Sequence, residues 1–549
     1  KNYKSKNNKT MKTIILIFLI ALTVECTSQI MPEPSYINQL WKAEFGADNQ
    51  LGMTVDAAGN IYVIGSTFNE SIDWLIIKYS PSGERLWFTQ FNEDYSNRED
   101  IPHAIAVDNL GNVYVTGESY YLSADYLTIK YNSQGAKQWQ KRYGGPSQDI
   151  ALGIALDENG NVYVTGKEMT GGNLNCVTLK YSSGGTLLWE KQYDGPTGNY
   201  DMGKVIAAAS DGSIYVAGST ESPANAYDYL LIKYNSSGTE QWVRTFDGPA
   251  HGTEGVRNMV LGYNNSIFIT GISEGTGTDY DYLTVRYNAA GYIQWSKRYN
   301  GPVNGDDRAV SLAVDDIGNT YVTGYSESNL GYDYATVKYS LNGTFQWLKR
   351  EDGSNASDDY AGDIAVDDDG DIYVTGKFKK ANDNYLMATV KYSSSGSQKW
   401  VKKYDVSGKV SEGRNIFVDG SENIIVGGMS DRSGSGHGWY EQYLVVKYTQ
   451  NRYVIVNRNG VPAEFSLSQN YPNPFNPVTK ISFSIPNNSY TKLTVYDISG
   501  KQVAELINSE LEAGSYNIDF DASHLASGTY FYRITAGNFT EVKKMILVK

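Results

Sequence analysis

Hydrophobic and polar residues alternate along most of this chain in a pattern that returns about every fifty residues. One copy contains four such runs, at residues 104–107, 112–117, 125–131 and 137–143. Strict alternation over a few residues is typical of half-buried β-strands, because successive side chains point to opposite faces. Turn-forming residues separate the runs at 108–112 and 132–135. Each copy is therefore predicted to form four short antiparallel strands.

The period of the repeat indicates the architecture. The ten residues from Asp108 to Gly117 recur along the chain, with a step of 49 positions from Gly117 to Gly166 and of 53 from Gly218 to Gly271. Four strands in a repeat of this length are the signature of a β-propeller blade. The first strand of each copy is rich in small residues, which suit strands crowded around a central channel. The chain is therefore predicted to be all-β.

The two ends of the array are offset from each other. A strand ending in Lys-Tyr or Arg-Tyr occurs eight times, from Tyr79 to Tyr448, and a strand containing Trp occurs eight times, from Trp41 to Trp400. The array therefore opens with a fourth strand and ends with a third strand. We expect Leu40 to Phe45 to pair with Tyr443 to Tyr448, which closes the ring and removes two sheet edges. This predicts an eight-bladed propeller, or a seven-bladed one if a repeat is irregular, with each repeat Trp in the core.

The repeat stops near Glu464, and a different pattern begins. A proline-rich stretch, Tyr471 to Pro477, is expected to be extended. Alternating runs follow at 480–485, 492–497, 502–506, 515–520, 529–536 and 541–548. These runs predict a small immunoglobulin-like β-sandwich. We expect the propeller to cover residues 30–449, a linker residues 450–463, and the C-terminal domain residues 464–549.

The N-terminal residues have the pattern of an export signal. Basic residues precede a short apolar run from Ile14 to Leu22, and small residues follow it. This run is too short to span a bilayer as a helix, so residues 1–29 are predicted to be a signal peptide with an upstream extension. No transmembrane segment is expected after cleavage. Only Cys176 then remains, which excludes an internal disulfide and a cysteine metal cluster.

Composition and motifs restrict the chemistry. The formal net charge of −14 argues against binding to nucleic acid, which needs a basic face. The four histidines are scattered, and no nucleophile or phosphate-loop motif is present, so no catalytic residue, metal or cofactor is expected. The Asp-x-x-Gly-Asn turns, with Asp367 to Asp371 the most acidic, lack the distal Glu of a calcium loop. They are expected to be Asp-capped turns.

Binding is expected on one face of the ring. The loops that join second to third strands, and one blade to the next, vary in length, whereas the other loops are tight turns. Variable loops on a rigid scaffold are where ligands usually bind. The most deviant loop, Gly428 to Gln442, carries His437, Trp439 and Tyr440, which we predict to contact an extracellular glycan or protein. We expect a monomer.

Two resemblances support this interpretation. The repeated phrase, as in Asp108 to Gly117, resembles the bacterial β-propeller repeat called SBBP, over about residues 36–449. The C-terminal domain resembles the type A sorting domain of type IX secretion. The residues that match are Tyr471, Pro472, Asn473, Pro474, Phe475, Gly514, Tyr516, Gly528, Tyr530, Lys543 and Lys544. The second resemblance implies export through the periplasm to the outer surface, with the type IX secretion machinery as partner.

Three functions remain open at this point. The first, which we favour, is a non-enzymatic binding or adhesion scaffold at the cell surface or outside the cell. The second is a hydrolase or lyase acting on extracellular polysaccharide, because acidic residues are abundant. The third is a purely structural surface protein. Convergent carboxylates in a pocket would favour the enzyme, and an aromatic groove would favour binding.

Overall fold

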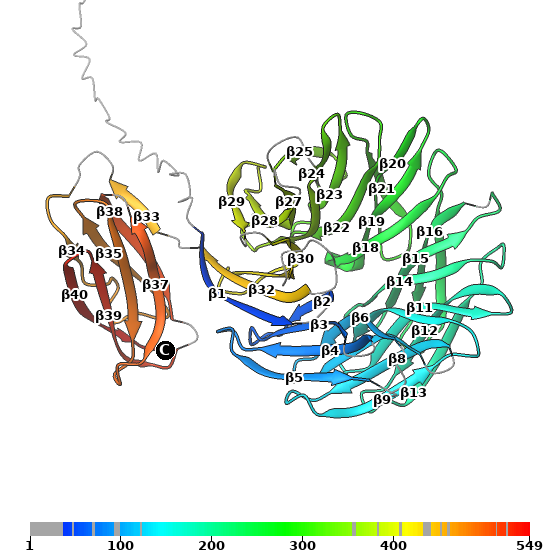
Figure 1. Ribbon diagram of the computed structural model, residues 1–549, viewed down its shortest axis with the longest axis horizontal. Helices are drawn as coiled ribbons and strands as arrows, with labels where there is room; N and C mark the ends of the chain where they lie inside the picture. Colours follow the sequence, from blue (N-terminus) through cyan, green and yellow to red (C-terminus); the bar gives the residue numbers. More distant parts are fainter. Residues whose placement is uncertain are drawn as a thin grey trace, which may run out of the picture.

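A computed structural model describes residues 37–46, 49–68, 72–92, 99–120, 123–224, 226–353, 358–380, 384–405, 409–431, 441–450, 453–457, 462–511, 513–522 and 525–549. The predicted signal peptide lies outside these residues. Within them the chain is all-β, apart from one 3-10 turn at Tyr263–Asn265. Figure 1 shows the strands arranged as a propeller-like ring, with a separate group of strands, β33 to β40, outside it.

The ring contains eight four-stranded antiparallel sheets in the described part of the chain, here numbered in chain order. Sheets 1 to 4 are β2 (Asn49–Val55), β3 (Ile61–Phe68), β4 (Ile72–Tyr79) and β5 (Arg85–Phe91); β6 (Asp100–Val107), β7 (Val113–Tyr120), β8 (Ala124–Tyr131) and β9 (Lys137–Tyr143); β10 (Asp149–Leu156), β11 (Val162–Thr170), β12 (Asn173–Tyr181) and β13 (Leu187–Tyr193); and β14 (Asp201–Ala208), β15 (Ile214–Glu221), β16 (Tyr227–Tyr234) and β17 (Glu240–Phe246). Sheets 5 to 8 are β18 (Glu254–Gly262), β19 (Ser266–Gly275), β20 (Thr278–Tyr287) and β21 (Ile293–Tyr299); β22 (Asp307–Val314), β23 (Thr320–Ser328), β24 (Gly331–Tyr339) and β25 (Phe345–Glu351); β26 (Tyr360–Val366), β27 (Ile372–Lys379), β28 (Tyr385–Tyr392) and β29 (Gln398–Tyr404); and β30 (Ser411–Val418), β31 (Ile424–Asp431), β32 (Glu441–Gln450) and β1 (Ile37–Gly46).

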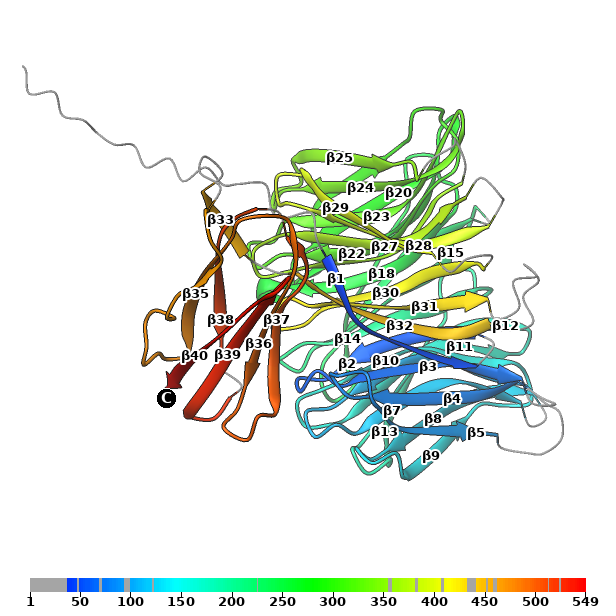
Figure 2. The ribbon, with the colours of Figure 1, turned by 60° about the vertical axis from the view of Figure 1, so that its left-hand side comes forward.

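The N-terminal strand completes the last sheet, as the offset of the repeats predicts. Strand β1 pairs antiparallel with β32, and the register joins Trp41 to Lys447 and Phe45 to Tyr443. The first strands of successive sheets contact one another, and β30 of sheet 8 contacts β2 of sheet 1. The expected pairing of Leu40 to Phe45 with Tyr443 to Tyr448 is therefore confirmed. Figures 1 and 2 show β1 lying beside β32.

Six tryptophans of the fourth strands hold their sheet against the next by one and the same contact. The indole Nε1 of Trp139 donates to the carbonyl of Ser183, 3.1 Å away in the turn between the third and fourth strands of the next sheet. Trp41, Trp87, Trp189, Trp295 and Trp347 make the same bond, at 3.0–3.2 Å. The indole also packs against a glycine of that turn: a Cβ on Gly343 would lie 2.6 Å from Trp295 Cγ.

These tryptophans are less buried than the repeat suggests. Among those described, Trp295 and Trp400 are buried, each with 7% of its surface exposed, and the other repeat tryptophans are half-buried. The reason is their position. The indole lies on the outermost strand at the junction of two sheets, where one edge meets solvent and the other meets the neighbouring turn.

The Asp-x-x-Gly-Asn turns are Asp-capped, as predicted. In one copy Asp108 Oδ1 accepts from the backbone amides of Leu110 and Asn112, both at 2.9 Å. Its Oδ2 accepts from Asn112 Nδ2 at 2.8 Å and from the Tyr114 hydroxyl at 3.0 Å. Asp367 makes the corresponding bonds to the amides of Asp369 and Asp371. The carboxylate therefore fixes the turn and ties it to the second strand.

The C-terminal strands form two four-stranded antiparallel sheets that share one hydrophobic core. One sheet has the order β33 (Tyr453–Asn457), β38 (Gly514–Asp521), β35 (Val478–Ile485) and β34 (Ser466–Leu467). The other has the order β37 (Gln502–Leu511), β36 (Ser489–Tyr496), β39 (Gly528–Ala536) and β40 (Phe539–Leu547). Strand β33 falls inside the segment expected as a linker, yet it pairs with β38.

The docking contact can be tested at its best-buried described copy. Replacing Trp295 with Ala should destabilise the ring by about 3–5 kcal/mol, because it leaves a cavity between sheets 5 and 6. Gly343→Ala should also destabilise it, since the new Cβ meets the same indole at a positive φ of 74°. Gly171→Ala is the control, because that glycine has φ 64° and open space around it. Urea denaturation midpoints check these effects, and equal losses for the two glycine variants would contradict the contact.

Closure of the ring gives a second expectation. Deleting residues 30–46 removes β1 and leaves β32 with an unpaired edge, so the protein should aggregate. Size-exclusion chromatography with light scattering provides the measurement. A monomeric deletion variant with the wild-type melting temperature would show that β1 is dispensable for the ring.

Candidate functional site

The predicted ligand residues His437, Trp439 and Tyr440 lie outside the described residues, so their role stays a prediction. His103 and His251 are described, and each faces a carboxylate: His103 Nε2 lies 3.3 Å from Glu118, and His251 Nδ1 lies 2.5 Å from Asp247. The described parts of the ring still distinguish its two faces. In Figure 2 the second strand of sheet 8, β31, points to the right. The loops that follow the second strands therefore lie on the right-hand face of the ring in that view.

An arc of tyrosines breaks the repeat symmetry on this face. One position recurs near the start of every third strand, three residues before the residue that pairs with the glycine near the middle or end of the second strand. In sheets 4 to 7 this position holds Tyr227, Tyr280, Tyr332 and Tyr385, here called the tyrosine arc. In sheets 1, 2, 3 and 8 it holds Ile72, Ala124, Leu174 and Glu441. One half of the ring therefore has an aromatic rim.

Two further tyrosines adjoin the tyrosine arc between sheets 6 and 7. Tyr325 and Tyr360 lie next to it, with ring centroids 4.9 Å apart. Tyr332 is 5.4 Å from Tyr325 and 5.6 Å from Tyr360, and Tyr385 is 6.4 Å from Tyr360. All four rings are half-buried. They fix one another by edge contacts and still present part of their surface to solvent.

Basic side chains accompany these rings. Lys377 Nζ lies 4.9 Å from the Tyr385 centroid and 5.5 Å from that of Tyr360, and Arg308 lies 5.0 Å from the Tyr280 ring. Acidic partners neutralise both, because Lys377 pairs with Glu412 at 2.8 Å and Arg308 with Asp306 at 2.7 Å. The cations hold the rings in place and give the rim polar contacts beside its aromatic surface.

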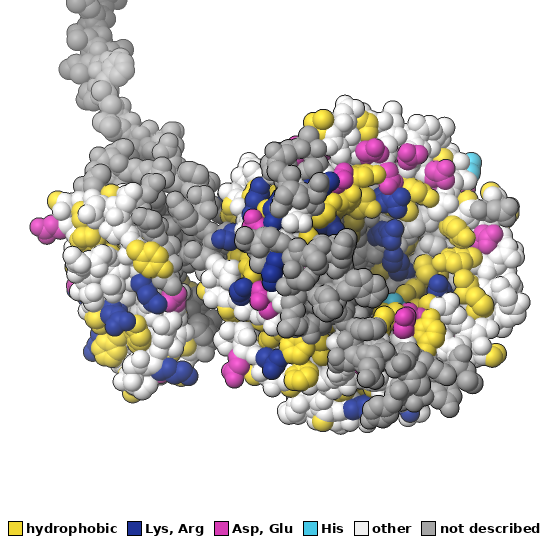
Figure 3. All heavy atoms as spheres, in the orientation of Figure 1, with side chains coloured by type: hydrophobic (Ala, Val, Ile, Leu, Met, Phe, Trp, Pro, Cys, Tyr) yellow, Lys and Arg dark blue, Asp and Glu magenta, His cyan; other side chains and the backbone are white. Residues whose placement is uncertain are grey.

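Two further cations lie on the innermost strands. Lys204 and Arg257 occupy register irregularities in β14 and β18, and neither pairs with a carboxylate among the described residues. Burial, together with the charge of Arg257, lowers the pKa of Lys204 to about 8. Figure 3 shows Lys and Arg side chains gathered at the hollow in the middle of the ring. This part of the ring is therefore electropositive, in a chain that is acidic overall.

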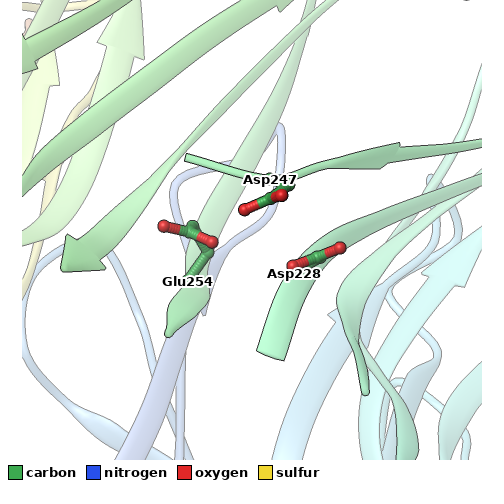
Figure 4. A group of neighbouring side chains, drawn as sticks. All are labelled: Asp228, Asp247 and Glu254. Atoms are coloured by element: carbon green, nitrogen blue, oxygen red, sulfur yellow. The ribbon is translucent and has the colours of Figure 1, made fainter. Parts of the chain in front are cut away.

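A cluster of carboxylates lies where sheet 4 meets sheet 5. Asp228 is near the start of β16, Asp247 follows β17, and Glu254 starts β18; one oxygen of each lies within 4.8 Å of those of the other two. Figure 4 shows the three side chains pointing toward one another. Glu254 is fully buried and Asp228 is 9% exposed. Asp228 Oδ1 and Glu254 Oε2 have no hydrogen-bond partner among the described residues.

Burial sets the electrostatics of this cluster. It raises the pKa of Glu254 to about 7, against the hydrogen bond from Ser273, and the charges of Asp228 and Asp247 add to the shift. Burial and the charge of Asp247 raise the pKa of Asp228 to about 6. The pKa of His251 is raised by its hydrogen bond with Asp247. The cluster therefore holds negative charge at an energetic cost.

The predicted sorting residues divide into buried and exposed groups. Phe475 and Tyr516 are 2% and 1% exposed, and Tyr516 stacks on Phe483 at 5.1 Å. Tyr530 is also buried, and its hydroxyl donates to the Ala526 carbonyl at 2.7 Å. Gly514 and Gly528 start strands β38 and β39, and Lys543 pairs with Glu541. Many of the matching residues therefore build the domain itself.

The exposed group lies on one edge of this domain. Tyr471 is 82% exposed, and Pro472, Pro474 and Lys544 are exposed beside it. Asn473 fixes this edge, because its Nδ2 donates to the Lys544 carbonyl at 3.3 Å and its Oδ1 accepts from the Ile546 amide at 2.9 Å. The proline-rich motif is therefore held against the backbone of β40 (Phe539–Leu547) at Lys544.

Family models match both parts of the chain. The β-propeller repeat SBBP matches residues 86–120, 138–167 and 347–377, and the secretion system C-terminal sorting domain matches residues 469–549. The chain therefore carries SBBP repeats and a type IX sorting domain. It is a secreted propeller protein, found outside the cell or at the cell surface. No helix in the described residues has the length and hydrophobicity needed to cross a membrane.

Among solved structures, similar folds include PorZ, an essential surface component of the type IX secretion system of Porphyromonas gingivalis. The identity is 13% and the TM-score 0.36, over 91% of this chain and 75% of PorZ. A polysaccharide lyase, the PL25 ulvan lyase, aligns at 14% identity and TM-score 0.37, over 67% and 96%. The BP39L lectin of Burkholderia pseudomallei aligns at 8% and 0.39, over 66% and 100%. No curated protein matches the chain significantly. Likenesses of this degree do not assign a function.

The raised pKa values predict how stability depends on pH. Unfolded Asp and Glu titrate near pH ~3.9 and ~4.3, below the folded values of Asp228 and Glu254. The folded state therefore binds more protons, and stability should fall as pH rises from about 4 through 7. Glu254→Gln should flatten this fall and raise the free energy of unfolding by roughly 1–3 kcal/mol at pH 8 in metal-free buffer. Urea denaturation at pH 5 and pH 8 measures it. Exposed Glu158→Gln is the control, and identical pH profiles for both variants would contradict the burial argument.

The sorting assignment gives a cellular prediction. A chain that ends after Gln450 lacks the whole C-terminal domain, including β33, which would otherwise lose its partner β38. In its native host this chain should fold and accumulate in the periplasm, because the export determinant is gone. Cell fractionation with an antibody to the ring provides the measurement. Recovery of the truncated chain at the cell surface would contradict the assignment.

Proposed function

We propose that this protein is a non-enzymatic binding scaffold, an eight-bladed propeller that an immunoglobulin-like C-terminal domain directs to the cell surface. The eight four-stranded sheets and the β1–β32 pairing support the blade count. The two C-terminal sheets with one core support the sandwich. The proposed boundaries are residues 1–29 for the signal peptide, 30–450 for the propeller and 453–549 for the C-terminal domain, because β33 belongs to the latter.

The tyrosine arc carries the binding proposal. A structural tyrosine would recur in every sheet, as the buried tyrosine near the end of each third strand does from Tyr79 in sheet 1 to Tyr448 in sheet 8. The arc occupies only four consecutive sheets, on the face formed by the variable loops, and its rings keep part of their surface exposed. Aromatic rings with a polar tip suit amphipathic ligands, which stack an apolar face and hydrogen-bond through their edges.

The cations near the arc specify the ligand class. Lys204 and Arg257 lie close enough for the charge of one to lower the pKa of the other. A carboxylate or sulfate group bound between them would relieve that repulsion and accept hydrogen bonds from both. The ligand that combines sugar-like faces with such groups is an acidic polysaccharide. We therefore assign an acidic extracellular glycan to this face.

The hydrolase or lyase alternative finds less support. Three carboxylates do converge, at Asp228, Asp247 and Glu254. Glu254, however, is fully buried, and a glycosidic oxygen must reach its general acid directly or through one water. The carboxylates therefore suit a small ion better than a polymer.

The proposed partner of the C-terminal domain is the type IX secretion machinery. The surface made by Tyr471, Pro472, Pro474 and Lys544 offers it an exposed aromatic ring, rigid prolines and a positive charge. The buried members of the motif, such as Phe475 and Tyr516, hold that surface in shape. The propeller face and this surface are thus proposed to serve binding and export separately.

Binding can be tested with a single pair of variants. Tyr332→Ala should weaken binding of an acidic polysaccharide by about tenfold or more, as removal of an aromatic anchor usually does. Tyr263→Ala is the matched control, because Tyr263 is 80% exposed but lies in the tight turn between β18 and β19, on the other face. A glycan array followed by titration calorimetry measures both. Equal affinities of the two folded variants would remove the arc from the binding site.

A further inference from the structure

The carboxylate cluster occupies a position that three other sheets neutralise with an arginine. Near the start of their third strands, sheets 2, 5 and 6 have Asp125, Asp281 and Asp333, at positions equivalent to Asp228 in sheet 4. Each of these three aspartates pairs with an arginine of the fourth strand: Arg142, Arg298 and Arg350, at 2.6–2.7 Å. In these three sheets the aspartate is one half of an ion pair, whereas the equivalent Asp73 of sheet 1 accepts a hydrogen bond from Gln90 at 2.8 Å.

Sheet 4 lacks that arginine. The residues that pair with Arg142, Arg298 and Arg350 across the strands are Leu127, Leu283 and Ala335. The equivalent Leu230 pairs with Thr245. A threonine side chain is too short to reach Asp228 and carries no charge. The start of β18 adds to the imbalance, because Glu254 stands there where Asp149, Asp307 and Asp359 stand in other sheets, and its longer side chain reaches further.

The result is an acidic cluster that lacks the arginine of sheets 2, 5 and 6, in which Glu254 and Asp228 are buried and Asp247 is exposed. Asp228 is 9% exposed, and its Oδ1 has no hydrogen-bond partner in the described part of the chain; Figure 4 shows the Asp228 side chain pointing toward Asp247 and Glu254. Arg298 touches Glu254 only through the Ser273 hydroxyl and is itself paired with Asp281. His251 reaches the cluster from the loop, but it is exposed and binds only Asp247. A bound cation is one way to satisfy buried carboxylate oxygens that have no partner.

We propose that Asp228, Asp247 and Glu254 bind a divalent metal ion, Ca²⁺, which does at this junction what arginine does at the others. The donors are all carboxylate oxygens, which hard cations prefer. Ca²⁺ holds its ligands at 2.3–2.6 Å, so two ligands of one ion lie at most about 5 Å apart. The three oxygens meet this limit, since they lie within 4.8 Å of one another. The ion would tie the loop between β17 and β18 to both sheets, independently of any glycan ligand.

The test is calorimetric titration of CaCl₂ into the chelator-treated full-length protein. One Ca²⁺ should bind with a Kd of about 10⁻⁴ to 10⁻³ M, the range of extracellular modules. Asp228→Asn and Glu254→Gln should each weaken binding at least about tenfold. Asp352→Asn is the matched control, because Asp352 lies at a junction with Asp333 and Asp359 that already has Arg350. This control should bind Ca²⁺ like the wild type.

A charge-restoring variant makes the test decisive. Thr245→Arg places a guanidinium in the register of Arg142, Arg298 and Arg350, so it should abolish Ca²⁺ binding and the rise in melting temperature that Ca²⁺ causes in the wild type. A folded Thr245→Arg protein that binds Ca²⁺ with unchanged affinity would overturn the proposal. So would a wild-type protein that shows no heat of binding and no shift in melting temperature with millimolar Ca²⁺ or Mg²⁺. Binding of Mg²⁺ alone would overturn the choice of Ca²⁺.

Discussion

The contact between a fourth-strand indole and the turn of the next sheet is the interaction on which the ring depends. In its usual form the same carbonyl accepts from two donors: Ser183 O accepts from Trp139 Nε1 and from Lys130 Nζ, both at 3.1 Å. Lys130 also lies 4.9 Å from the Tyr114 ring, and the Tyr114 hydroxyl binds the Asp108 turn. Each such junction therefore connects the third strand, the fourth strand and the Asp-capped turn of one sheet to the receiving turn of the next sheet. Glycine is required in the receiving turn, because a side chain there would overlap the indole.

These shared contacts explain why a residue that departs from the repeat is a candidate for a functional role. Residues of the junctions recur because each serves the same contact, so a position that differs has been released from that contact or serves another one. The tyrosine arc occupies four adjacent sheets, and sheet 4 has Thr245 where sheets 2, 5 and 6 have an arginine. Both departures lie on the face opposite the tight turns. The face with Asp-capped turns is the structural side of the ring, and the other face is free to vary.

Most of the fold was predictable from the sequence, because the repeat gives many copies of the same signal. The runs at 104–107, 112–117, 125–131 and 137–143 fall within or largely within β6 to β9, and Trp41 is in the strand that closes the ring. Strands β33 and β34 escaped prediction, since β34 has two residues and β33 lies in a segment without alternation that is ordered only by β38. The burial of the repeat tryptophans was overestimated, because hydrophobicity does not show that a residue sits at a junction edge.

The candidate site was harder to predict than the fold. Sequence reasoning favoured the longest loop, with Trp439, over positions inside the strands. The tyrosine arc was present in the repeats, at Tyr227, Tyr280, Tyr332 and Tyr385. These four residues did not stand out, because the chain has many other tyrosines. The carboxylate cluster needs three segments, β16, the loop after β17 and the start of β18, to meet in space. Its sequence signal was the threonine at 245, which only a comparison of aligned repeats exposes.

The central claim is that function resides where the repeat symmetry breaks on the loop face. Hydrogen–deuterium exchange of the full-length protein, with and without an acidic polysaccharide, tests this claim most directly. The account predicts ligand-dependent protection at the strand ends that carry Tyr227, Tyr280, Tyr332 and Tyr385, and none at the Asp-capped turns. Protection confined to sheets 1 to 3, or to the tight-turn face, would contradict it.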